Sequence, residues 1–209
     1  MTTTLPTNKP SGHESTASRT ARSADTRQEL LRDGTRVVIR PIRPDDTDQE
    51  RHFIETLSPR VRRFRFLDSI RTPSAELLRQ MTVVDPATGV AYVAVIGTGQ
   101  QEEQIGVARF SAQGAGTDCE FAVAVSDAWQ SKGLGTLLMQ RLIEQARARG
   151  LDTMHSSDAS DNDLMRRFAA HLHMQHQRDP DDATMVLYSL NVAQSALPDS
   201  PPARDAAGS

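Results

Sequence analysis

The run from residue 120 to 136, EFAVAVSDAWQSKGLGT, carries the most chemistry in this chain of 209 residues. An apolar stretch after Glu120 leads through a short turn to Gly133 and Gly135, and then to a helical repeat of leucines. Glycines at a helix start leave N–H groups without intrahelical partners, and these groups and the helix dipole form an anion site suited to a pyrophosphate. Lys132 adds a positive charge. The alternative to an anion site is an ordinary helix start with turn glycines. The spacing of the glycines fits neither a P-loop nor a GxGxxG dinucleotide motif.

The elements around this run follow an order of strand, helices, three strands, helix, strand, helix and two strands. Apolar alternation predicts strands at 35–40, 90–96, 105–110, 119–125, 153–156, 174–177 and 184–190. Apolar residues at helical spacing predict helices at 44–58, 59–66, 74–81, 131–149 and 162–172. This order predicts a mixed α+β domain.

The two ends of the chain differ in composition from its middle. Residues 1–28 are rich in Thr, Ser and Arg, and residues 192–209 in Ala, Pro, Ser and Asp, with no apolar periodicity in either. Such segments bury too little apolar surface to offset the entropy of ordering them. We therefore expect a folded domain at 29–191 between two disordered tails.

Charge and composition exclude several function classes. The net charge of −3 predicts no nucleic-acid partner, and no stretch approaches the roughly 20 apolar residues that span a bilayer. The N-terminus lacks the apolar core of a secretory signal. Cys119 is the one cysteine, so no internal disulfide is possible, which is typical of a reducing compartment. We expect a cytoplasmic protein without a membrane partner.

The segment Q-S-K-G-L-G after a strand resembles the acetyl-CoA pyrophosphate motif of the GNAT superfamily of N-acetyltransferases. The phrases IRPIRPDD, GVARF and EFAVAVSDAWQSKGLGTLLMQRLIEQARARG are most similar to the GNAT domains of bacterial protein-lysine acetyltransferases. The resemblance covers about 150 residues. It implies a central, mostly antiparallel twisted sheet of six to seven strands flanked by about four helices. We expect no fused CoA-ligase-like or cyclic-nucleotide-binding domain in this chain.

The resemblance also implies which residues bind acetyl-CoA, the acyl-donor cosubstrate. The backbone of β-strand residues 123–125 would pair with the pantetheine arm and polarise the thioester carbonyl, and Asn162 would contact the arm near its thiol end. Arg166 or Arg167 would reach a CoA phosphate, although surface arginines on a helix are usually solvated. The full expected set is Val123, Ala124, Val125, Gln130, Ser131, Lys132, Gly133, Leu134, Gly135, Thr136 and Asn162.

Glu120 is the candidate general base. A lysine amine, with a pKa near 10.4, must lose a proton before it attacks a thioester, and a carboxylate in a partly desolvated cleft can accept that proton. Related lysine acetyltransferases carry a glutamate at the matching position, which is regarded as their base. The alternative is a solvated glutamate at a strand end.

Several other residues depart from the family pattern or have plainer explanations. The expected position of a tyrosine acid is Ala169, and His173-Met174 replaces a common Gly-Phe pair. We expect Cys119 to be a half-buried spectator, since no histidine lies near it in sequence. The HxHxxH cluster at 171–176 spans a helix end, so its side chains should diverge and bind no metal. A basic run at 60–71 fits a solvated helical face, a docking site for an acidic protein or a patch that steers the phosphates of CoA.

Three functions are compatible with these residues. The first is transfer of an acetyl group from acetyl-CoA to a protein lysine in a ternary complex with Glu120 as base, with acyl-CoA synthetases as one candidate class of acceptor. The second is the same chemistry on a small-molecule amine. The third is a sensor that binds acyl-CoA without turnover. Glu120 favours an enzyme, whereas the missing tyrosine favours the sensor.

Overall fold

Eight strands form one sheet in the computed structural model, which describes residues 25–66, 72–112, 114 and 116–195. The strands are β1 Arg27–Leu30, β2 Arg36–Pro41, β3 Gly89–Ile96, β4 Glu103–Ala112, β5 Asp118–Val125, β6 Thr153–Ala159, β7 Gln175–Arg178 and β8 Met185–Asn191. Their order in the sheet is β1-β2-β3-β4-β5-β6-β8-β7. Every neighbouring pair is antiparallel except β5 and β6, which run parallel. The mostly antiparallel mixed sheet confirms the predicted fold class.

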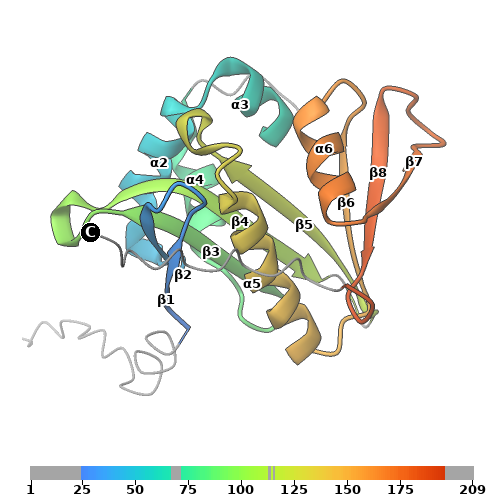
Figure 1. Cartoon of the computed structure of the whole chain (residues 1–209), viewed down its shortest axis with the longest axis horizontal. Helices are drawn as coiled ribbons and strands as arrows, with labels where there is room; N and C mark the ends of the chain where they lie inside the picture. Colours follow the sequence, from blue (N-terminus) through green and yellow to red (C-terminus); the bar gives the residue numbers. More distant parts are fainter. Residues whose placement is uncertain (1–24, 67–71, 113, 115, 196–209) are drawn as a thin grey trace, which may run out of the picture.

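Helices cover both faces of this sheet (Figure 1). Helices α5 (Leu134–Ala148) and α6 (Asp163–His171) pack on one face, where residues 134, 138, 142 and 146 of α5 are buried as their spacing predicts. Helices α2 (Thr47–Thr56), α3 (Pro59–Phe66) and α4 (Ala75–Thr82) pack on the other, around Phe53, Ile54 and Leu78. None of the helices described combines the length and apolar character needed to cross a membrane.

The first strand departs from the sequence prediction. Strand β1, RQEL, pairs with β2 and begins two residues before the expected domain start at Glu29. Its side chains are mostly exposed, so it shows none of the apolar alternation that marks a strand. It raises the sheet to eight strands, where six to seven were expected. The expected tails otherwise fall mainly on residues 1–24 and 196–209, which lie outside the described part of the chain.

The sheet opens between β5 and β6. These two strands pair only from Asp118 to Glu120 on β5 and from Thr153 to His155 on β6. Beyond that point β5 continues beside β4, and β6 continues beside β8 as far as Ala159. The edge of β5 from residue 121 onward therefore has no partner strand within the described residues, and a gap forms in the middle of the molecule.

Candidate active site

A cavity of about 490 Å³ occupies the gap where β5 and β6 diverge. Its walls come from residues 120–125 of β5, the loop before α5, residues 156–158 of β6, and the facing sides of α3 and α6. This volume lies in the range of small-molecule binding sites. An extended ligand segment laid along the free edge of β5 could pair with its backbone as an added strand does.

The loop before α5 has the conformation of an anion site. Ser131 and Gly133 both have positive φ, 62° and 93°, and Gly133 is the N-cap of α5 with no side-chain cap. The first bond of the helix runs from the Leu137 N–H to the Gly133 carbonyl, 3.1 Å away. The N–H groups of residues 134–136 therefore have no acceptor within the helix and, together with the helix dipole, attract an anion. This explains why α5 starts at Leu134 rather than at the expected Ser131.

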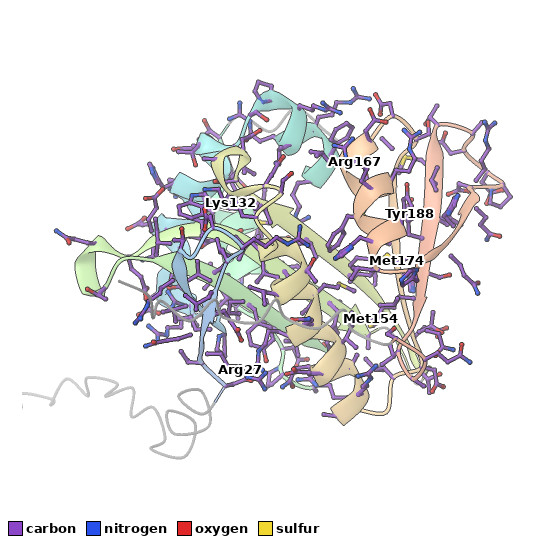
Figure 2. All side chains as sticks on the ribbon, in the orientation of Figure 1. Arg27, Lys132, Met154, Arg167, Met174 and Tyr188 are labelled. Atoms are coloured by element: carbon purple, nitrogen blue, oxygen red, sulfur yellow. The ribbon has the colours of Figure 1, made fainter. Side chains whose placement is uncertain are left out.

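Side chains of the loop hold its shape. The Gln130 side-chain amide donates to the Val125 carbonyl at 3.1 Å, so it ties the loop to the end of β5. Trp129 packs against the core, and the Lys132 ammonium lies 4.5 Å from the centre of its ring. Lys132 also forms an ion pair with Asp33 at 3.1 Å. Figure 2 shows Lys132 on the side of the cleft nearest β1 and β2, with Arg167 across the cleft on α6.

The cavity brings together most of the residues expected to bind acetyl-CoA. Its lining includes Val123, Ala124, Val125, Gln130, Ser131, Gly133, Gly135, Thr136 and Asn162. Lys132 and Leu134 are not part of the lining. The Leu134 side chain is buried in the core, so only its backbone belongs to the helix start.

Glu120 lies at the branch point where β5 and β6 separate. Cys119 and Phe121 point into the core under α5, and Glu120 therefore faces the side of the sheet that α2, α3 and α4 cover. Its side chain is exposed and lines the cavity together with Phe64 and Arg65 of α3. The carboxylate is thus accessible from the face of the sheet opposite the one on which α5 and its preceding loop lie.

A second carboxylate in the cavity, Asp158, has no counterpart in the sequence-based predictions. Asp158 accepts two hydrogen bonds from the Asn162 side-chain amide, both at 3.0 Å, and one from the Ala159 N–H. Asn162 in turn caps α6 by accepting from the Met165 N–H. Burial raises the pKa of Asp158, which outweighs the opposing effect of these hydrogen bonds. Asp158 and Asn162 together hold the start of α6 against β6.

The remaining candidates are placed as follows. Cys119 is buried, and burial raises its pKa to about 11. Ala169 is buried in the core at the position expected for a tyrosine acid. Within the described residues no three His, Cys, Asp or Glu side chains are arranged to hold a metal. His171 lines the cavity, whereas His173 and His176 are exposed outside it.

The basic run on α3 is partly neutralised by acidic residues at the start of α6. Arg60 pairs with Asp163 at 3.9 Å, and Arg63 pairs with Asp161 at 3.1 Å. Both pairs are exposed and so contribute little to stability. Arg71, the last residue of the predicted patch, lies outside the described residues. Of the two arginines proposed for a CoA phosphate, Arg166 pairs with Asp163, and Arg167 lines the cavity.

Comparison with known structures gives the same fold. The GNAT domain of PAT from S. lividans superposes with a TM-score of 0.75 at 24% identity, covering 81% of this chain and 98% of that domain. A cAMP-binding acyltransferase from Mycobacterium smegmatis superposes with a TM-score of 0.58 at 26% identity, covering 88% of this chain and 54% of that one.

Sequence comparison gives the family. A model of the acetyltransferase (GNAT) family matches residues 60–174. Acetyltransferase PA5475 of Pseudomonas aeruginosa is 40% identical over 162 residues, which are 78% of this chain and 87% of that protein. Acetyltransferase Pat of Mycolicibacterium smegmatis is 31% identical over 138 residues, which are 66% of this chain but only 40% of that longer protein. The chain therefore belongs to the GNAT family and is an acetyl-CoA-dependent N-acetyltransferase.

Proposed function

We propose that this enzyme transfers an acetyl group from acetyl-CoA to the side-chain amine of a protein lysine, with Glu120 as the general base. The observation that carries the proposal is the position of Glu120 at the branch of β5 and β6. The carboxylate faces the α3 side of the sheet, whereas the helix-start amides that suit a pyrophosphate belong to α5 on the other side. Donor and acceptor would approach from opposite sides and meet at the free edge of β5.

The residues of the cleft fit acetyl-CoA. The open N–H groups of residues 134–136 and the loop at 131–133 would hold the pyrophosphate. The unpaired edge of β5 at 123–125 would bind the pantetheine amides, and its N–H groups would polarise the thioester carbonyl. A Cβ built on Gly135 would lie 3.4 Å from the Phe168 ring of α6, so a methyl group would just fit there and a larger side chain would meet the cavity wall. A small residue at 135 keeps the backbone accessible to a phosphate.

The base is needed because of the acceptor's charge. With a pKa near 10.4, only about one lysine amine in a thousand is neutral at pH 7.5. Glu120 would accept a proton from the ammonium, directly or through one water, and the neutral amine would then attack the thioester carbon. A C–N bond forms and the C–S bond breaks, the attacking nitrogen releases its second proton to solvent, and the CoA thiolate takes a proton from solvent. Ala169 is buried and has no proton to give, so this step proceeds without a tyrosine acid.

The charges around the cavity favour a protein acceptor over a polycationic small amine. Its lining carries three arginines, Arg32, Arg65 and Arg167, and two carboxylates, Glu120 and Asp158. An enclosed site for a polyamine or an aminoglycoside would need an excess of acidic groups to attract several ammonium groups. Glu120 is also exposed at the surface, where a lysine on a protein can reach it.

A competition assay separates the acceptor classes. The enzyme is incubated with acetyl-CoA and a panel of acceptors: folded proteins with surface lysines, an acyl-CoA synthetase among them, polyamines, amino acids and aminoglycosides. We expect mass spectrometry to detect acetyl-lysine on one or more proteins and the small amines to remain unmodified. Efficient acetylation of a small amine, without any protein product, would contradict the protein-lysine proposal.

A further inference from the structure

The hairpin formed by β1 and β2 lies against the loop before α5, although the residues in contact, Arg32 and Lys132, are 100 positions apart in sequence. The Arg32 N–H donates to the Lys132 carbonyl at 3.0 Å. At the same turn, the Asp33 carboxylate pairs with the Lys132 ammonium at 3.1 Å. The family match starts at residue 60, so this hairpin lies outside the part of the chain that the family model describes.

Lys132, the cation that the sequence motif supplies, is already engaged. Hydrogen bonds from Thr35, reinforced by Lys132, lower the pKa of Asp33 to about 2, so Asp33 is charged at neutral pH. The Lys132 ammonium also rests over the Trp129 ring. The local charge of Lys132 is therefore largely balanced by Asp33.

Arg32 is the cation that reaches the loop. A Cβ built on Gly133 would lie 3.5 Å from both Cγ and Nε of Arg32, so this side chain runs directly alongside the helix N-cap. Arg32 lines the cavity and is exposed. Among the residues that the structure describes, no carboxylate forms an ion pair with its guanidinium. A guanidinium beside open helix N–H groups matches the geometry of a phosphate ligand.

The hairpin is held firmly enough to position this side chain. The Asp25 carboxylate accepts hydrogen bonds from the Tyr92 hydroxyl and the buried Arg141 guanidinium. Arg27 pairs with Glu144 of α5 at 3.0 Å, and Leu31 is buried in the core under α5. Both ends of β1 are thus attached to the helix whose N-terminus Arg32 adjoins.

We propose that Arg32 binds the pyrophosphate of acetyl-CoA, so that the N-terminal hairpin completes the donor site. The inference rests on the proposed function, since it assumes that the donor's phosphates lie at the start of α5. It assigns to Arg32 the electrostatic role that the sequence motif would give to Lys132.

The test measures affinity and kinetics for Arg32→Ala, with Arg36→Ala and Lys132→Ala in parallel. Arg36 is exposed on the same hairpin but does not line the cavity, so it is the matched control. Calorimetric titration should show acetyl-CoA binding to Arg32→Ala weakened by about tenfold or more, as expected for a charge-assisted contact. KM should rise with kcat unchanged, because the contact is the same in ground and transition states. Arg36→Ala should match the wild type.

Truncated donors locate the contact. The loss of donor affinity in Arg32→Ala should persist with acetyl-dephospho-CoA, which keeps the pyrophosphate. It should disappear with acetyl-pantetheine, which has no phosphate. Loss of the penalty with acetyl-dephospho-CoA would overturn the assignment to the pyrophosphate. The role of Arg32 would be overturned if Arg32→Ala bound acetyl-CoA with wild-type affinity, or if Lys132→Ala lost more affinity than Arg32→Ala. Failure of the wild-type enzyme to bind acetyl-CoA would instead overturn the proposed function itself.

Discussion

The Cys119 thiol is kept protonated by the core that surrounds it. Its pKa of about 11 reduces the thiolate fraction roughly 100-fold relative to an ordinary cysteine. Since it is the one cysteine of the chain, its reactivity can be measured without interference. We expect native enzyme at pH 7.5 to react with a thiol reagent roughly 100-fold more slowly than glutathione does, and denatured enzyme to react at once. Rapid labelling of the native enzyme would contradict the burial of this thiol, and an acyl-cysteine detected by mass spectrometry would contradict direct transfer.

Asp158 makes stability depend on pH in a defined direction. Because burial raises its pKa above the unfolded value of 3.8, the native state binds a proton more tightly than the unfolded state does. The stability associated with this group is therefore present at low pH and is lost as pH rises through the native pKa. Between pH 4 and 7, urea unfolding should show the wild type losing stability relative to Asp158→Asn. If the wild type instead gained stability relative to this variant as pH rises, the hydrogen bonds from Asn162 would lower the pKa of Asp158 by more than burial raises it.

At the level of single residues, the sequence predicted best what is local. The free amides at the start of α5 follow from a glycine pattern within a few residues, and the cavity lining includes Gln130, Ser131, Gly133, Gly135 and Thr136 of this segment. Asp158 and Arg32 were not predicted as site residues. They reach the cavity through the divergence of β6 and through pairing of the N-terminal hairpin, and neither is encoded in a short pattern.

Helix α6 ends in a turn that a glycine would suit better. His173 has a φ of 54°, and the N–H groups of His173 and Met174 bond back to carbonyls of the last turn. A side chain at positive φ is strained, and the family pattern has glycine at this position. His173→Gly should raise the free energy of unfolding by about 0.5–1 kcal/mol, measured by chemical denaturation.

A matched control shows whether this gain comes from the backbone conformation. Gln175 is exposed in β7 with ordinary strand geometry, so Gln175→Gly should lower stability. If His173→Gly destabilised the enzyme as much as Gln175→Gly does, the contacts of the His173 side chain would contribute more to stability than the strained backbone conformation costs.

The strands and helices with clear apolar periodicity were predicted from sequence, and β1 was not. Its residues, RQEL, lie at the sheet edge with exposed side chains, so pairing with β2 and the anchoring of Asp25 define it instead. Long-range contacts of this kind leave no periodic signal. Arg32 lies on the same hairpin, so a sequence pattern that misses β1 also misses Arg32 as a residue of the site.

At the scale of the whole molecule, the open sheet organises the chemistry. The parallel contact of β5 and β6 is only three residues long, so the cavity passes between the α5 side, with its open helix amides, and the α3 side, with Glu120. A direct transfer needs donor and acceptor in the cleft together, and this two-sided cleft allows that. The chain spans 40% of the length of the Mycolicibacterium relative that it matches.

The most direct test of this account is the rate of CoA thiol release from acetyl-CoA in the presence of a protein acceptor, for wild type, Glu120→Gln and Asp118→Asn. Asp118 is an exposed acid on the same strand outside the cavity lining, and it serves as the control. We expect kcat to fall about 10²–10³-fold in Glu120→Gln, with acetyl-CoA affinity retained, because the variant loses only the proton acceptor. Asp118→Asn should keep the wild-type rate. Acceptor-dependent release at wild-type rate in Glu120→Gln would contradict the assignment of Glu120 as the base.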